Sequence, residues 1–530
     1  MKRFRAGIAV AVAAALAGSV AAATHGSVRA AGTLVIDRSF EIKTADPQRA
    51  FEPTASIVDR GIYDTLLTYK GSDVAHPVPQ LVTSYKASNG AKTWTFNLKH
   101  NVRFANGQPL TAADVVFSFR RLINLKGNPA FLLDGVTVSS KGRYTVILRS
   151  KTPNTALPAI VSNTSLGVVN SKLVRAHGGT DAANAATADK AEQWLNSPAS
   201  AGAGSGPYVL RQYSTTSQIV LAPNAKYWGP NKAKWSSVVV RNQIAPTQLI
   251  NIQRGAHEVA IDLSAQQAQS IKSNPKLKVV LTPSTWVFWL FMNNNKDIST
   301  VTSNAHFQRA VRYAIDYGSV KEVGGPGTIQ APGIIPSTFL GHLTQKQKVV
   351  QNVALAKREL AASGFATTKI TLEYPSDLTI NGVPFASLAQ KIQSNLQSVG
   401  FDVDLGGATV GTWLQKYRDG KMAFGLSLWG PDYPDPADYL AFLPGNLVGL
   451  RVGWPAGSDP ALENLGAKVL VTPGTKQRET LYKQIQQRLN ASGPYVPLIQ
   501  PTQVFVATKD LRNANFNAVY QIDVTQVAPK

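Results

Sequence analysis

Hydrophobic and polar residues alternate in several short segments of the first half of the chain, up to about residue 280. TWTFNLK (93–99) places its tryptophan, phenylalanine and leucine on one face, RYTVILRS (143–150) shows the same pattern, and SQIVLAPN (217–224) repeats it more weakly. A period of two residues is typical of half-buried β-strands. Turn residues separate these segments, so the first half is predicted to consist largely of short strands.

One helix is predicted inside this region, in GQPLTAADVVFSFRRLIN (107–124). Thr111 is the expected N-cap, and Asp114 places a carboxylate near the positive end of the helix dipole. Four apolar residues at helical spacing form its buried stripe: Val115, Phe119, Leu122 and Ile123. Residues 177–206 are small, polar and glycine-rich, and they are predicted to form a short helix followed by a surface loop.

The pattern changes after about residue 284. FQRAVRYAIDYG (307–318) has apolar or small residues at spacings of 0, 3, 4, 7, 8 and 11, which predicts one amphipathic helix. Beyond a loop rich in glycine and proline, strand patterns alternate with helix patterns. The predicted strands are KITLEY (369–374), FDVDL (401–405) and MAFGLSLW (422–429). This alternation indicates a second, α/β domain.

The end of the chain returns to β-strand character. PLIQPTQVFVATKD (497–510) matches the first half better than the second, so we expect the C-terminus to rejoin the first domain. The predicted division is a first domain of 33–282 plus 500–530 and an inserted domain of 283–499. Two segments then cross between the domains, which is the geometry of a hinge.

The first thirty residues predict a secretory signal peptide (1–30). MKRFR supplies positive charge, and AGIAVAVAAALAGSVAAA supplies an apolar run of small residues. Cleavage after Ala23 and cleavage after Ala30 both fit the sequence. An N-terminal membrane anchor is the alternative, but the run is short and alanine-rich. No later segment reaches about 18 uninterrupted apolar residues, the length of a membrane span.

Composition narrows the class of protein. The 530 residues are 44% hydrophobic and 16% charged, which provides enough apolar surface for globular domains. The chain contains no cysteine, which excludes disulfides, thiolate metal sites and a lipid-modified cysteine after the signal peptide. The mature protein is therefore expected to be soluble and to lie in a bacterial periplasm.

The formal net charge of the chain is +23. Such a basic chain suggests nucleic-acid binding, but its cations are scattered and do not alternate with aromatic residues. We interpret the charge as a solvated basic surface, and no nucleic acid is expected as a partner.

Motifs for catalysis are missing from the sequence. No two of the seven histidines are three or four residues apart, so no helical zinc motif is present, and no serine lies in a G-x-S-x-G elbow. GAGSGPY (202–208) lacks the Gly-Lys-Ser/Thr of a phosphate-binding loop. Asp432 and Asp435 could form a glycosidase pair, but they lie in a proline-rich loop. We therefore expect no enzymatic activity, no cofactor and no bound metal.

Five stretches of the chain match one family pattern in order and spacing. They are WTFNLKHNVRFANGQPLTAADVVFSFRRL (94–122), GSGPYVL (204–210), VFWLFMNNN (287–295), FQRAVRYAIDYGSV (307–320) and LWGPDYPDPADYL (428–440). Together they resemble the large extracellular solute-binding proteins, family 5, that feed peptide ABC importers. The resemblance covers essentially the whole mature chain. FEIKTADPQ (40–48) and WGPDYPDP (429–436) are most similar to the oligopeptide-binding branch.

The resemblance implies an α/β, two-lobed periplasmic-binding-protein fold. The first lobe would carry an extra subdomain at about 66–200, and a hinge would join the lobes. Such a protein, a monomer, captures short peptides in an extended conformation as the lobes close. It then delivers them to the ABC permease subunits in the inner membrane. The expected ligand has a free N-terminus.

The stretch 428–440 is the expected centre of the site, because it follows an apolar strand, where α/β domains present ligands. Its three prolines fix φ and stiffen the loop. The resemblance implies that Asp432 neutralises the α-amino group of the peptide, since an unpaired charge in a site with little water costs several kcal/mol. Asp435 and Asp438 are expected to serve as turn and cap residues.

Four further residues are candidates for ligand contact by the same resemblance: Trp429, Trp413, Tyr433 and Glu41. The two tryptophans are expected to wall the side-chain pockets, with burial in the core as the alternative. Glu41 is expected at the rim of the first lobe. No lysine or arginine can be identified from the sequence as the partner of a carboxylate group on the ligand.

Two other functions stay open. An exported hydrolase would need a nucleophile and a base that the sequence does not show. A non-peptide solute, such as an opine-like compound, glutathione, a metal chelate or another anionic ligand, would fit other members of the same family.

Overall fold

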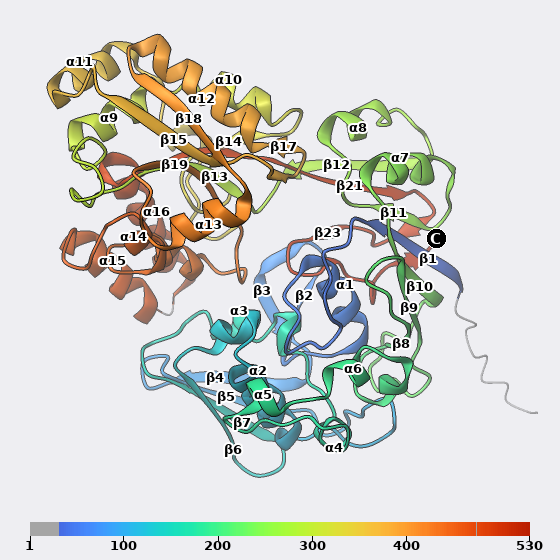
Figure 1. Ribbon diagram of the computed structural model, residues 1–530. Helices are drawn as coiled ribbons and strands as arrows, with labels where there is room; N and C mark the ends of the chain where they lie inside the picture. The colour runs from blue at the N-terminus through green and yellow to red at the C-terminus, as the bar shows by residue number, and fades with distance from the viewer. Residues whose placement is uncertain (1–30, 473) are drawn as a thin grey trace, which may run out of the picture.

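Two β-sheets form the cores of two lobes (Figure 1). The computed structural model describes residues 31–472 and 474–530, so the predicted signal peptide (1–30) lies outside the described residues. Lobe II, at the upper left of Figure 1, contains the strands between residues 287 and 500. Lobe I contains the strands that precede and follow it, together with an extra subdomain at the bottom of the view.

Lobe I is built on a seven-stranded sheet with the order β12-β21-β11-β1-β10-β9-β8. β1 is parallel to β10 and β11, and the other neighbours are antiparallel. In the middle of β1 and β10, alternate residues are apolar and fully buried, namely Leu34, Ile36, Val238 and Val240. The strands of this sheet are β1 (Ala31–Arg38), β8 (Tyr208–Gln212), β9 (Gln218–Pro223), β10 (Trp235–Asn242), β11 (Glu258–Ala260), β12 (Leu277–Pro283) and β21 (Thr502–Thr508). The helices are α1 (Pro53–Ile62), α7 (Ala245–Arg254) and α8 (Ala265–Ser270), and the short C-terminal strands are β22 (Leu511–Arg512), β23 (Phe516–Asn517), β24 (Gln521–Ile522) and β25 (Ala528–Pro529).

The extra subdomain holds an antiparallel sheet with the order β4-β5-β7-β6, against which α2 packs. The N-cap predicted for α2 is confirmed, because the backbone N–H of Thr111 donates to Asp114 Oδ2 at 2.9 Å. The strands here are β2 (Leu67–Lys70), β3 (Asp73–Pro79), β4 (Val82–Ser88), β5 (Thr93–Leu98), β6 (Val136–Ser140) and β7 (Thr145–Ser150). The helices are α2 (Ala112–Leu125), η1 (Asn128–Leu133), α3 (Leu157–Ile160), η2 (Thr164–Leu166), α4 (Ser171–Ala176), α5 (Ala185–Ala188), α6 (Glu192–Leu195) and η3 (Pro198–Gly202). Several short helices thus occupy 177–206, where the sequence predicted one helix and a loop.

A buried ion cluster ties this subdomain to the segment that precedes α1. The guanidinium of Arg121, on α2, bonds to Asp189 Oδ2 at 2.7 Å through Nε and to Asp46 Oδ2 at 2.6 Å through Nη2. All three side chains are fully buried. Buried charges of this kind are tolerated only when each is paired and hydrogen-bonded.

Lobe II is built on a six-stranded mixed sheet with the order β14-β20-β13-β19-β15-β18. Its strands are β13 (Val287–Met292), β14 (Ile329–Gln330), β15 (Lys369–Pro375), β18 (Asp402–Ala408), β19 (Phe424–Trp429) and β20 (Tyr495–Gln500), and a separate hairpin joins β16 (Thr379–Ile380) to β17 (Val383–Pro384). Its helices are α9 (Ala305–Ala314), α10 (Tyr317–Val323), η4 (Gln345–Gln347), α11 (Val353–Ser363), α12 (Phe385–Val399), α13 (Val410–Arg418), η5 (Pro436–Phe442), α14 (Leu447–Arg451), α15 (Pro460–Val471) and α16 (Thr475–Ser492). The α/β alternation predicted after residue 284 is confirmed.

The prediction of a single helix over 307–318 is wrong, because the chain forms α9 and α10 with a break between them. Ile315 is extended, and the carboxylate of Asp316 accepts from the backbone N–H groups of Gly318 at 3.0 Å and Ser319 at 3.2 Å. An aspartate in this position is a strong helix N-cap. It starts a new helix although the apolar spacing continues through the break.

The chain passes between the lobes twice. β12 leads into β13 through residues 284–286, and β20 leads into β21 through Pro501. The two passages are bonded to each other, because the Ser284 N–H donates to the Pro501 carbonyl at 2.8 Å and Gln500 Nε2 donates to the Ser284 carbonyl at 2.9 Å. The strand-like stretch 497–510 is therefore divided at Pro501 between the two sheets.

Candidate ligand-binding site

A cavity of about 840 Å³ lies between the two lobes. Lobe I contributes the segments that follow β1 and β11, and lobe II contributes the β16–β17 hairpin and the loop 430–434 that follows β19. β1, β11 and β19 thus lead into the cavity from their carboxyl ends, where sheets of α/β proteins present ligands. The volume falls within the roughly 300–1,000 Å³ of pockets that enclose a ligand.

The loop after β19 is held from behind by two aspartates. Asp438 Oδ2 accepts from the indole Nε1 of Trp429 at 2.7 Å and from the backbone N–H of Asp432 at 3.3 Å. Asp435 caps η5 through the backbone N–H of Ala437 at 2.9 Å and forms an ion pair with Arg478 at 2.6 Å. Burial and the nearby Asp432 raise the pKa of Asp438 well above its usual range. These contacts fix the loop without using the Asp432 side chain.

Asp432 is one of the residues that line the cavity. Among residues 31–472 and 474–530, no side chain forms an ion pair or a hydrogen bond with its carboxylate, although the backbone carbonyl of Asp432 accepts from Asn163 Nδ2 of lobe I at 3.3 Å. Burial raises the pKa of Asp432 to about 6, and the positive charge of Arg451 acts in the opposite direction. Desolvation disfavours the ionised form of a carboxylate, so a cation in the cavity would stabilise Asp432.

Lobe I contributes two acidic residues around one guanidinium to the lining of the cavity. Arg38 Nη2 lies 3.3 Å from Glu41 Oε1, and Arg38 Nη1 lies 3.4 Å from Asp262 Oδ1. Glu41 also accepts from the backbone N–H and the hydroxyl of Thr54, both at 2.9 Å, near the N-terminus of α1. The sequence reasoning missed Arg38 and Asp262, since they lie far apart in the chain and in no recognisable motif.

The aromatic lining differs in part from the predicted one. Tyr433 lines the cavity together with Phe51, Trp286, Phe339 and Phe516. At Gly430, next in the chain after β19, an added Cβ would lie 2.6 Å from the Trp286 ring, so glycine lets this ring pack against the loop backbone.

The two tryptophans expected in the pocket walls are not among the lining residues. Trp413 is 4% exposed and stacks on Tyr417, one helical turn further along α13, with ring centroids 5.1 Å apart. Trp429 packs against the core and directs its indole N–H to Asp438, behind the loop. The hydrogen bond and the apolar packing thus draw both rings away from the cavity.

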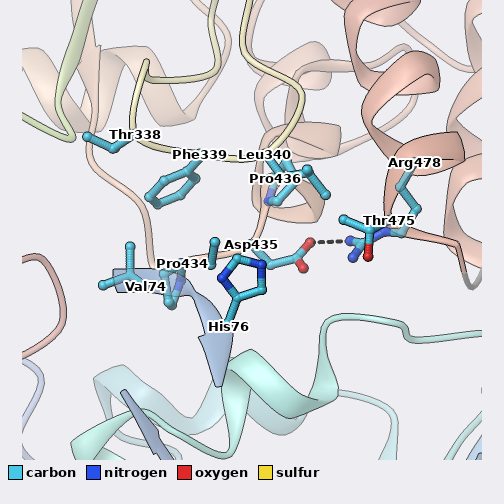
Figure 2. A pocket seen from close by; sticks show the side chains of 11 residues that line it. Val74, His76, Thr338, Phe339, Leu340, Pro434, Asp435, Pro436, Thr475 and Arg478 are labelled. Atoms are coloured by element: carbon cyan, nitrogen blue, oxygen red, sulfur yellow. Dashed lines mark hydrogen bonds and ion pairs between the residues drawn. The ribbon is translucent and has the colours of Figure 1, made fainter. Parts of the chain in front are cut away.

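A second cavity, of about 70 Å³, lies behind the wall that Phe339 and Pro434 form (Figure 2). His76 and Val74, from β3 of the extra subdomain, face these two residues, and the Asp435–Arg478 ion pair closes one side. β3 therefore lies close to lobe II at Phe339 and Pro434, which line both cavities.

Two further properties of the described residues concern membranes and metals. None of the helices in the described ranges combines the length and the hydropathy that a bilayer crossing needs. Within the same ranges, no group of three histidine, aspartate or glutamate side chains is placed to hold a metal ion.

A cavity between two α/β lobes that are joined by paired crossings is the architecture of a solute-binding protein. The family model "Bacterial extracellular solute-binding proteins, family 5 Middle" matches residues 76–447, and the chain belongs to this family. The family and the two-lobed fold predicted from the sequence are confirmed.

Relatives and a solved structure support this assignment over almost the whole chain. The probable D,D-dipeptide-binding periplasmic protein DdpA of Escherichia coli (strain K12) is 28% identical over 497 residues, which is 92% of each chain. The periplasmic oligopeptide-binding protein OppA of the same organism is 25% identical over 492 residues, covering 88% of this chain and 86% of the relative. The structure of HbpA2 from Haemophilus parasuis is similar at a TM-score of 0.80 and 19% identity, over 94% of this chain and 100% of the other.

Proposed function

We propose that this protein captures short peptides in an extended conformation between its lobes, in the periplasm, and delivers them to an ABC permease in the inner membrane. The observation that carries the proposal is Asp432, which lines the cavity and whose carboxylate forms no ion pair among the described residues. The α-amino group of a peptide is a cation that every peptide with a free N-terminus provides. A charge-assisted hydrogen bond to it would anchor one end of the ligand.

The rest of the affinity would come from contacts that do not depend on the peptide sequence. Extended peptides gain affinity from main-chain hydrogen bonds, and the side chains then enter pockets of their own. The aromatic residues of the lining offer flat apolar surface for such side chains. We expect a monomer that accepts peptides of several sequences.

The crossings at 284–286 and at Pro501 are the proposed hinge, with 33–282 and 500–530 in lobe I and 283–499 in lobe II. Opening of the lobes would separate Asp432 from Asn163 and expose the cavity. The contact of Asn381 Nδ2, in the β16–β17 hairpin, with the Thr502 carbonyl at 2.9 Å lies next to this hinge.

A non-peptide anionic solute, the alternative from the sequence, finds little support in the lining. Among the described residues that line the cavity, only Arg38 is basic. Its guanidinium already forms ion pairs with two carboxylates. An anion would also meet Asp432. The charges of the cavity therefore favour an amine over a carboxylate or a phosphate as the anchored group.

Calorimetric titration with trialanine and with N-acetyl-trialanine tests the proposal. The free peptide is expected to bind at least about tenfold more tightly, because acetylation removes the charge that neutralises a buried carboxylate. Amidation of the carboxyl end serves as the matched control, and we expect it to change the affinity much less. Equal affinities of the free and acetylated peptides would refute the role of the amine.

The affinity for a free amine is expected to depend on pH around the pKa of Asp432. This pKa is about 6 in the empty protein, and a bound ammonium group would lower it, so the full affinity is present above pH 6 and is lost as the pH falls below it. Below that pKa the loss approaches about tenfold per pH unit. Titrations of trialanine at pH 5, 6 and 7 measure the effect, and a constant affinity across this range would contradict it.

A further inference from the structure

The net charge of the residues that line the large cavity is negative, whereas the net charge of the whole chain is positive. The chain has a formal net charge of +23. Its cavity, in contrast, is lined by three carboxylates, from Glu41, Asp262 and Asp432, and by the single guanidinium of Arg38. A ligand with one positive charge at Asp432 leaves the remaining negative charge of the lining unbalanced.

This remaining charge is exposed to the cavity, because the cation lies deeper than its two partners. The side chain of Arg38 is 12% exposed, whereas those of Glu41 and Asp262 are 36% and 26% exposed. Further bonds hold Arg38 in its place, through Nε to Thr54 Oγ1 at 3.1 Å and through Nη1 to Gln521 Oε1 at 3.4 Å. A ligand that approaches lobe I would therefore meet more of the two acidic side chains than of the arginine side chain.

The two negative groups come from opposite lobes. Asp432 belongs to lobe II, whereas Glu41 and Asp262 belong to lobe I, so closure of the lobes over an empty cavity would bring these negative charges closer together. Like charges repel more strongly in a space with little water than in bulk solvent. A ligand that carries one cation at each end of the cavity would remove this repulsion, whereas an acidic ligand would increase it.

We propose that the protein selects peptides with a second positive charge, a lysine or arginine side chain that the exposed carboxylates of Glu41 and Asp262 receive while Asp432 binds the α-amino group. This inference rests on the proposed function, because it takes the ligand to be a peptide. It names the class of peptide, and it gives Glu41 and Asp262 the role of specificity-determining residues.

Calorimetry with six tripeptides tests the selection. The set is Ala-Lys-Ala, Ala-Gln-Ala and Ala-Glu-Ala, together with the isomers that carry the variable residue at the third position. In at least one position, the lysine peptide is expected to bind about tenfold more tightly than the glutamine peptide, and the glutamate peptide is expected to bind most weakly.

Glu41→Gln is the variant of choice, because glutamine keeps an oxygen for Thr54 and Arg38 while losing the charge. We expect it to reduce the affinity for the lysine peptide several-fold relative to that for the glutamine peptide. The matched control is Glu479→Gln, whose side chain is 39% exposed and lies outside the cavity lining. If Glu41→Gln does not fold, as judged by its thermal transition, Asp262→Asn takes its place with the same expected pattern.

The outcomes separate this inference from the proposed function. Equal binding of the lysine and glutamine peptides at both positions, with binding still weakened by N-acetylation, would overturn the selection and leave peptide capture standing. A lysine preference that survives in both Glu41→Gln and Asp262→Asn would overturn the assignment to these residues. If none of the six peptides binds, both proposals fail.

Discussion

Replacing Asp432 by asparagine is expected to weaken the binding of trialanine by about 2–5 kcal/mol, the usual cost of removing one partner of a buried charge pair. The expected effect is large because Asp432 is the one acid of the lining that forms no ion pair within the described protein. Asparagine has nearly the same shape but leaves the ammonium group of the peptide without a counter-charge. Calorimetry at pH 7 measures the loss.

The stability of the empty variant provides the control for folding. Burial raises the pKa of Asp432 to about 6, so the ionised side chain opposes folding above that pH, and the effect disappears as the pH falls below the unfolded value. At pH 7 the variant is therefore expected to melt at the same temperature as the wild type or higher. Asp404→Asn, on an exposed pair with Lys369, should change neither property. An Asp432→Asn variant with undiminished affinity for trialanine would contradict the proposed anchor.

Replacing Arg121 by methionine is expected to lower the free energy of unfolding of lobe I by about 3–5 kcal/mol, as for other broken buried ion pairs. Methionine fills much of the space, but Asp46 and Asp189 are then left buried without the guanidinium between them. Urea denaturation followed by tryptophan fluorescence measures the change.

A comparison with an exposed arginine separates the loss of the ion cluster from the loss of a charge. Arg254, in the last turn of α7, is exposed, and Arg254→Met is expected to change the stability by less than about 0.5 kcal/mol. If Arg121→Met were as stable as this control, the buried cluster would not contribute to the fold.

Much of the fold could be predicted from local pattern alone. Strands β5, β7 and β9 follow the period of two, and the start of α2 follows from a threonine and an aspartate three residues apart. Where two local signals compete, the pattern is insufficient. The apolar spacing continued through 307–318, but the capping preference of Asp316 prevailed and divided the helix.

The site was less accessible to sequence reasoning, because its chemistry depends on contacts between distant segments. Asp432, Tyr433 and Glu41 do line the cavity, yet nothing in the loop sequence shows that the carboxylate of Asp432 forms no ion pair within the described residues. The pairing of Arg38 with Asp262 joins the end of β1 to the segment after β11. The sequence also does not show in which direction a side chain points. Trp413, for example, stacks on Tyr417 and does not line the cavity.

The bonds between the two crossing segments restrict how the molecule can move. Because the Ser284 N–H donates to the Pro501 carbonyl, we expect the two segments to bend together in the proposed hinge, which would favour rotation about one axis. A clamp with one such degree of freedom reaches nearly the same closed shape for every cargo that fits. The proposed permease would then recognise the shape of the closed, ligand-bound protein and would not need to contact the ligand.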